Sequence, residues 1–166
     1  MPVRIILKDD CRKLPITFHY EGPNVHVVYP GLKKFLADVL NVPEEQVHEK
    51  QLSVSRSDDK EKIKAKFDVL RRIDKYSYML FEVSCSVEKK PSQQFESEGT
   101  VDVEIKGKLM TEIPQNTAWQ KSFVFQLLFT LFLHTWYNKK RKGYVNECKD
   151  AMFELERRFK KLLRIE

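Results

Sequence analysis

The longest apolar run of the chain, FVFQLLFTLFLHTWY, covers residues 123–137 and limits the fold more than any other segment. On a helix its large side chains occupy nearly the whole circumference, so the helix needs cover on several sides. Thr117 can cap this helix, which is expected to run to about Lys140, with a short break at residues 141–144. At 1.5 Å per residue the run falls short of the ~30 Å core of a bilayer, which argues against a transmembrane span.

A polar row runs along the same helix at every fourth position: Ser122, Gln126, Thr130, His134 and Asn138. Three interpretations of the helix are open. The preferred one is a core helix that packs between a sheet and a second helix. In the second, one side lies against a second copy of the chain or another protein. In the third, the helix lies at a membrane surface, with Trp119 and Trp136 near its ends and basic residues after it.

Three long segments alternate apolar and polar residues, and their apolar residues stand at odd positions: 63–73, 79–87 and 101–113. This period of two predicts strands with one buried face. Odd residues of the first two strands can face each other if the turn between them has an odd number of residues or if the hairpin contains a bulge. The predicted partners are Ile73 with Ser77, Arg71 with Met79, and Ala65 with Cys85. The polar segment 89–99 is the longest predicted loop and a candidate mobile lid.

The rest of the chain adds shorter elements. Residues 3–7 and 51–56 are predicted strands, and segments 16–20 and 25–29 are predicted to pair as a hairpin. Residues 32–40 and 144–163 carry apolar stripes at helical spacing.

This order of elements predicts a single α+β domain over residues 1–166. Its curved, mainly antiparallel sheet of about six or seven strands would pack against the long apolar helix and a C-terminal amphipathic helix. The order of the last strands and helix resembles the helix-grip, START-like architecture. That resemblance implies a cavity between sheet and helix that holds an apolar ligand. The hairpin at residues 16–29 and the second terminal helix depart from that pattern.

The cysteines, Cys11, Cys85 and Cys148, are far apart and form no CxxC pair. We therefore expect reduced thiols in a cytoplasmic protein. The N-terminal apolar run is too short for a secretory signal, which agrees with that location.

No catalytic or nucleotide-binding motif is present. Arg71 and Cys85 interrupt the apolar row of the predicted sheet, and a charge on a covered face needs a partner or a ligand. The predicted ligand-binding residues are Arg71, Cys85, Gln126, Thr130 and His134. His19 and His26 would face each other across the predicted hairpin and are weak candidates for a metal site. No metal or other cofactor is expected.

The net charge of +6 comes largely from the C-terminal region, including the cluster Lys139, Lys140, Arg141 and Lys142. Because acidic residues alternate with basic ones after this cluster, a solvated face is preferred over a nucleic-acid site. The leading prediction is a non-catalytic module that holds an apolar small molecule or a partner chain between the sheet and the helix at 117–140. The alternatives are a nucleic-acid-binding protein and a cavity-type enzyme that uses Arg71 and His134. Homo-oligomer formation through the apolar helix is also open.

Overall fold

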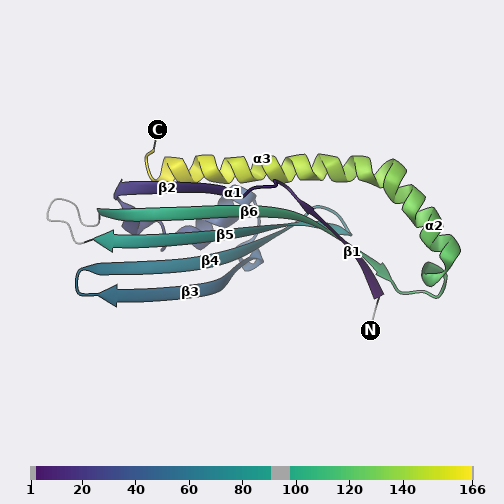
Figure 1. Cartoon of the computed structure of the whole chain (residues 1–166), viewed down its shortest axis with the longest axis horizontal. Coiled ribbons are helices and arrows are strands. Elements are labelled where there is room, and N and C mark those ends of the chain that lie inside the picture. The colour runs from purple at the N-terminus through teal and green to yellow at the C-terminus, as the bar shows by residue number, and fades with distance from the viewer. Residues whose placement is uncertain (1–2, 91–97, 166) are drawn as a thin grey trace.

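The computed structural model describes residues 3–90 and 98–165 (Figure 1). These described residues form six strands and three α-helices: β1 (Val3–Asp10), β2 (Ile16–Pro23), α1 (Leu32–Leu40), β3 (Val47–Ser57), β4 (Lys60–Arg72), β5 (Ser77–Lys90), β6 (Glu98–Gln115), α2 (Phe123–Phe132) and α3 (Asn138–Leu162). Short helical turns connect them: η1 (Val25–Val27), η2 (Glu44–Gln46), η3 (Trp119–Lys121) and the π-helical turn η4 (Leu133–Tyr137).

The strands form one antiparallel sheet in the order β1-β6-β5-β4-β3, and β2 also pairs with β6. β1 and β2 therefore follow one another along the same edge of β6, with Ile5 opposite Ile113 and Phe18 opposite Val103. The predicted α+β class, with a mainly antiparallel sheet, is confirmed.

The predicted register of the β4–β5 hairpin is confirmed, since Arg71 pairs with Met79 and Ala65 with Cys85. The carboxylate of Asp74 organises the turn by accepting hydrogen bonds from the backbone N–H groups of Tyr76 and Ser77, at 2.8 and 2.7 Å. This is the local side-chain bonding that favours aspartate in tight turns.

Two helices, α1 and α3, cover the face of the sheet that carries the odd-numbered residues of β4, β5 and β6. Phe159 of α3 is fully buried, and its ring centroid lies 4.7 Å from that of Phe35 on α1 and 5.9 Å from that of Phe18 on β2. Gly107 of β6 allows α3 to come this close, because a Cβ atom there would lie only 2.7 Å from the Met152 sulfur. The core is thus a sheet with one helical layer.

The helix that packs on the sheet is α3, and the predicted packing of the apolar helix was wrong. None of the ten residues of α2 is buried. α2 leaves the end of the sheet while α3 runs along it (Figure 1). The predicted break at residues 141–144 was also wrong, because α3 continues through Gly143 and the bend falls at η4. The apolar stripe of α3 meets the core, whereas α2 lies past the strand ends.

The start of α2 also differs from the prediction. Ser122, whose Oγ accepts a hydrogen bond from the Phe125 backbone N–H at 3.2 Å, caps the helix. Thr117 instead lies before the η3 turn, where its hydroxyl accepts a hydrogen bond from the Gln120 backbone N–H at 3.3 Å.

The predicted hairpin between residues 16–20 and 25–29 was wrong as well. β2 pairs with β6, and Val25–Val27 forms a helical turn after Asn24, which has a left-handed backbone conformation with φ of 68°. Val25 and Val28 are both buried, at the i, i+3 spacing of a helix rather than the alternation of a strand.

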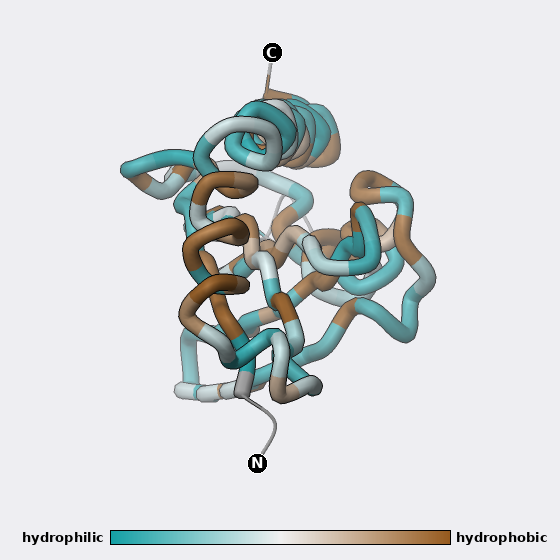
Figure 2. Tube along the Cα trace, turned by 90° about the vertical axis from the view of Figure 1, so that its right-hand side faces the viewer, coloured by the Kyte–Doolittle hydropathy of each residue, from teal (hydrophilic) through white to brown (hydrophobic). Residues whose placement is uncertain are grey.

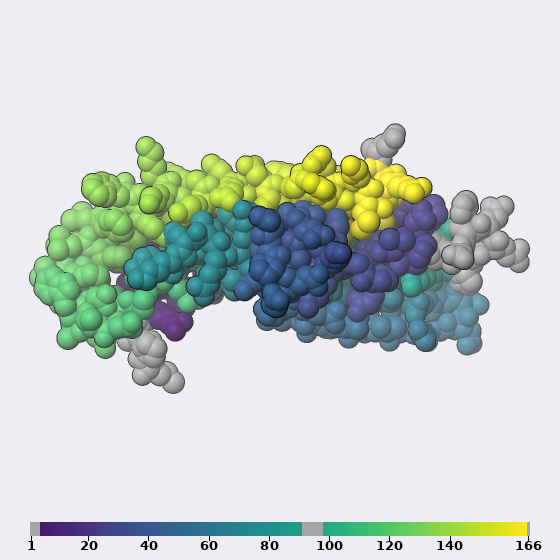
Figure 3. Space-filling view, turned by 180° about the vertical axis from the view of Figure 1, so that it is seen from behind, coloured from purple at the N-terminus to yellow at the C-terminus, as the bar shows by residue number. Residues whose placement is uncertain are grey.

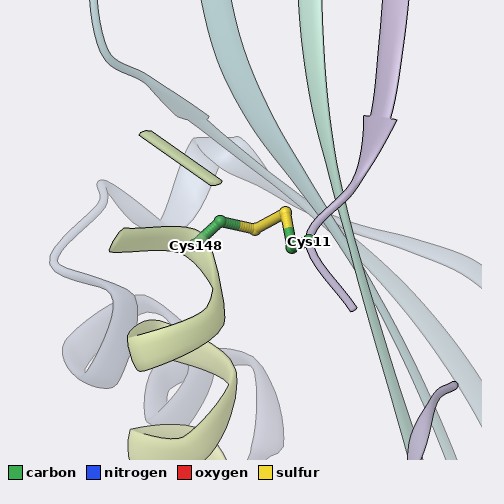
Figure 4. The surroundings of a disulfide bond; sticks show 2 residues. All are labelled: Cys11 and Cys148. Carbon is green, nitrogen blue, oxygen red and sulfur yellow. A yellow bond between two sulfur atoms is a disulfide. The ribbon is translucent and has the colours of Figure 1, made fainter. Parts of the chain in front are cut away.

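A disulfide between Cys11 and Cys148 corrects the expectation that all cysteines are reduced (Figure 4). It joins α3 to the segment that follows β1, across 137 residues of sequence. Cys85 remains a free, buried thiol. The pairing depends on the packing of α3 against β6, which sequence spacing does not reveal.

Residues 91–97 of the predicted lid lie outside the described residues. The flanking residues of that predicted loop belong to the ends of β5 and β6.

Candidate ligand-binding site

The inner side of α2 carries an aromatic stripe. The rings of Phe125 and Phe129 stack at an interplanar angle of 8° with centroids 5.7 Å apart. Phe132 continues the stripe to the buried Tyr137, with ring centroids 6.1 Å apart. The i, i+4 spacing of phenylalanines places the first two rings on one side of the helix.

A cavity of about 550 Å³ lies between this stripe and the ends of β5 and β6. We call it the aromatic cavity. Its lining residues are Lys75, Tyr76, Ile113, Pro114, Asn116, Thr117, Gln120, Phe125, Phe129, Phe132 and Tyr137. The volume falls within the range of roughly 300 to 1,000 Å³ that is typical of small-molecule sites.

The polar groups of the cavity lie in its loops. The side-chain oxygen of Gln120 accepts hydrogen bonds from the backbone N–H groups of Asn116 and Thr117, at 2.7 and 3.1 Å, and so holds the loop before α2. Lys75 is the one charged side chain among the described lining residues, and its ammonium lies 5.5 Å from the Tyr76 ring centroid. The cavity therefore pairs an aromatic wall with a single positive charge.

A buried hydroxyl network fixes the junction between α2 and α3. The Tyr137 hydroxyl lies 2.6 Å from Ser77 Oγ, which in turn lies 3.0 Å from Thr111 Oγ1. All three residues are buried, so each hydroxyl finds its partner within the protein. This network ties η4 to β5 and β6 and sets the direction in which α2 leaves the sheet.

The side of α2 opposite the cavity is exposed and apolar. We call this surface the outer face and define it by Phe123, Val124, Leu127, Leu128 and Leu131, each at least 52% exposed. In Figure 2 α2 is the brown coil below the mixed colours of α3. Within the described part of the chain, no helix combines the length and the apolar character needed to cross a bilayer.

Comparisons with known proteins leave the chain unassigned. No protein-family profile matches it, and no curated protein matches it. Among solved structures, a delta-endotoxin has a TM-score of 0.35 at 11% identity, with 69% of this chain and 64% of that chain covered. The activated Cyt2Ba monomer from Bacillus thuringiensis subsp. israelensis has a TM-score of 0.34 at 9% identity, with coverages of 66% and 74%.

The match thus spans slightly less than two thirds of the length of the delta-endotoxin. Structural similarity at these TM-scores does not indicate a shared function.

The five predicted ligand-binding residues do not meet in one site. Arg71 forms an ion pair with Glu147 of α3 at 3.0 Å, which satisfies the charge that suggested a ligand. Gln126 and Thr130 are exposed on α2 and His134 on η4, and the Thr130 hydroxyl donates to the Gln126 backbone carbonyl at 2.8 Å. None of these residues lines the aromatic cavity.

Cys85 is a core residue whose thiol has a pKa raised to about 12, chiefly by burial. It contributes to the floor of a separate hollow of about 640 Å³ on the uncovered face of the sheet. Charged residues of both signs, including Lys64 and Asp102, line that hollow. We prefer the aromatic cavity as the candidate site because stacked aromatic rings form one of its walls and because Lys75 is the one charged residue among its described lining residues.

The sequence prediction missed the sheet side of the aromatic cavity: Tyr76, Ile113 and Pro114. Tyr76 lies in the turn before β5, far in sequence from the phenylalanines that face it, and Ile113 and Pro114 lie near the end of β6. The spacing of Phe125 and Phe129 signalled the aromatic side of α2, but no local pattern indicates which strand ends lie opposite.

The other predicted sites are also placed by the structure. His19 Nδ1 lies 2.6 Å from Asp102 Oδ1 on the exposed sheet edge, whereas His26 belongs to η1, so the two histidines do not face each other across a hairpin. No group of three or more potential metal ligands occurs among the described residues.

Within the basic cluster, Arg141 pairs with Asp9 of β1. Lys139, Lys140 and Lys142 are exposed. One of the four charges of the nucleic-acid alternative is therefore engaged within the protein.

Proposed function

We propose that the protein is a non-catalytic binding module that holds an apolar small molecule with an anionic end group in the aromatic cavity. The observation that carries the proposal is the stacked pair Phe125 and Phe129, which faces the ends of β5 and β6 across about 550 Å³ of space. Stacked rings present a flat apolar wall that accommodates an alkyl chain or another ring. Lys75 would pair with the anionic end, because it is the one charged group among the described lining residues.

The attachment of α2 supports entry of a ligand. α2 contacts mainly η3 and η4, its neighbours in sequence, rather than the sheet. Few contacts with the core allow a segment to open locally at low cost, which is typical of elements that admit ligands. The Tyr137–Ser77 hydrogen bond would remain as the fixed end of such a movement.

A dansylated long-chain fatty acid tests the proposal, because its fluorescence rises when the chain enters an apolar site. Phe129→Trp enlarges a ring on the cavity wall, whereas Phe123→Trp makes the same change on the outer face. We expect Phe129→Trp to weaken binding about tenfold or more, and Phe123→Trp to leave it within about twofold. Equal effects of the two substitutions, or no saturable binding by the wild type, would overturn the proposal.

The charge of the ligand is tested separately with Lys75→Gln. We expect about three- to tenfold weaker binding of the dansylated acid, and no change for its methyl ester, since only the acid carries a charge. An equal loss for both probes would show that Lys75 does not recognise the anionic end.

The cytoplasmic location stays a prediction. The Cys11–Cys148 disulfide argues against a cytoplasmic location, since structural disulfides are rare in the cytoplasm of mesophiles. Alkylation of thiols in intact cells, followed by mass determination of the protein, distinguishes the reduced from the bonded pair.

A further inference from the structure

We infer that the outer face of α2 docks on the surface of a bilayer that contains anionic lipids, which goes beyond the proposed cavity function. The outer face is at one end of the molecule, where α2 forms a convex projection (Figures 1 and 3). All five of its side chains are large and apolar, and each is at least 52% exposed. Nothing in the described chain covers them.

The exposed apolar area of the outer face is comparable to the largest apolar patch of a typical soluble monomer. With roughly 100 Å² for each half-exposed large side chain, the outer face offers on the order of 500 Å². Phe132 and two tryptophans, at 45%, 60% and 75% exposure, extend it. An apolar patch of this size, the largest on a typical soluble monomer, is often a functional surface.

The charge around α2 identifies the chemistry of the partner. Residues 113–146 contain no aspartate or glutamate, although the chain has 24 of them. The same segment contains the exposed residues Lys121 before α2 and Lys139, Lys140 and Lys142 after it, whereas Arg141 is paired with Asp9. Basic residues on either side of an apolar helix complement the negative surface of anionic lipid headgroups.

The two tryptophans of the chain, Trp119 and Trp136, stand on either side of α2. Indole rings are enriched at the depth of lipid headgroups, where their apolar body and polar N–H are both satisfied. The exposed polar residues Gln126, Thr130 and His134 border the outer face along the helix. A helix that lies parallel to the surface keeps these polar side chains at headgroup level.

The shape of the apolar surface favours a bilayer over a protein partner. Exposed apolar side chains run from Phe123 round to Phe132, over about half of the helix circumference. A protein would need a deep groove to cover this convex surface, whereas fluid acyl chains adapt to it. At 1.5 Å per residue, α2 is about 15 Å long, so it would enter one leaflet and not cross the membrane.

Vesicle binding tests this inference, and the two tryptophans of the chain serve as fluorescent probes. Because both tryptophans border α2, their emission reports directly on this segment. We expect a blue shift and quenching by brominated lipids with phosphatidylcholine vesicles that contain about a third phosphatidylserine. Co-sedimentation should show at least about tenfold weaker binding to phosphatidylcholine alone.

Leu128→Glu on the outer face should lower binding to the anionic vesicles about tenfold or more. Leu52→Glu on the edge strand β3 is the matched control, because Leu52 is also exposed, and it should bind like the wild type. Both positions are on the surface, so folding is expected to be retained, which far-UV circular dichroism checks.

Equal binding of the two variants would overturn the inference, and so would absent wild-type binding. A dimer in sedimentation that Leu128→Glu dissociates, without vesicle binding, would assign the outer face to a second copy instead. The cavity variant Phe129→Trp should still bind vesicles. Loss of fatty-acid binding and loss of membrane binding are therefore separable.

Discussion

Replacement of Phe159 by alanine tests which helix forms the core. Phe159 is fully buried on α3, where its ring meets Phe35 at 4.7 Å and Phe18 at 5.9 Å between centroids. These rings come from α1 and β2, so Phe159 connects α3 both to α1 and to the sheet. Its removal leaves a cavity that none of the three elements can fill alone.

The cost is expected to be large. Phenylalanine to alanine substitutions at fully buried positions lower the free energy of unfolding by about 3 to 5 kcal/mol, of a total of about 5 to 15 kcal/mol for a domain. For a chain of this length each kcal/mol shifts Tm by about 2 to 4 °C, which predicts a fall of roughly 6 to 20 °C.

Phe123→Ala on α2 is the matched control, because Phe123 is 77% exposed. Its cost should be below about 0.5 kcal/mol. Urea unfolding followed by circular dichroism measures both values from midpoints and slopes. A cost for Phe123→Ala as large as that for Phe159→Ala would show that α2, not α3, packs in the core.

Three further predictions concern the thiols and one ion-pair cluster. Reduction of the Cys11–Cys148 disulfide should destabilise the fold by up to about 5 kcal/mol, which is the chain-entropy value for a cross-link across 137 residues. An unchanged urea midpoint in the presence of a reductant would contradict this prediction. Cys85, whose pKa is raised to about 12 by burial, should resist Ellman's reagent in the native protein. After unfolding without reductant, the reagent should detect one thiol per chain, whereas three thiols would refute the disulfide. Hydrogen bonds from Arg157 and Arg158 lower the pKa of Glu154 from 4.5 to about 2. Because this folded-state pKa is depressed, the carboxylate stabilises the protein above pH 4.5, and the contribution is lost as pH falls toward 2. Glu154→Gln should therefore reduce the urea midpoint slightly at neutral pH and not near pH 2; an equal reduction at both would exclude a role for this ionisation.

The candidate site was only half predictable from the sequence. Phe125 and Phe129 stand four residues apart, which places them on one side of a helix in any fold. The opposite wall depends on Tyr76 and Ile113, which reach the cavity only because β5 and β6 pair and end beside α2. Arg71 was expected to need a partner or a ligand, and Glu147 of α3 is that partner.

Local periodicity determined the long strands β4, β5 and β6 and the register of the β4–β5 hairpin. Alternation at odd positions and a short turn at Asp74 were sufficient to pair Arg71 with Met79, because successive side chains of a strand point to opposite faces of the sheet. The apolar stripe of α1 was also predictable, because helical spacing places its apolar residues on one side of the helix. These patterns depend on contacts between residues that are close in the chain.

Only the tertiary structure decided which helix the sheet would bury. Hydrophobicity alone favoured α2, yet Gly107 of β6 and the buried stripe of α3 fit each other, and Cys11 bonds to Cys148 where they meet. Packing depends on the shape of two surfaces that are distant in sequence, and hydropathy does not encode shape. The most apolar segment of the chain therefore remains on the surface, where its outer face is free to bind.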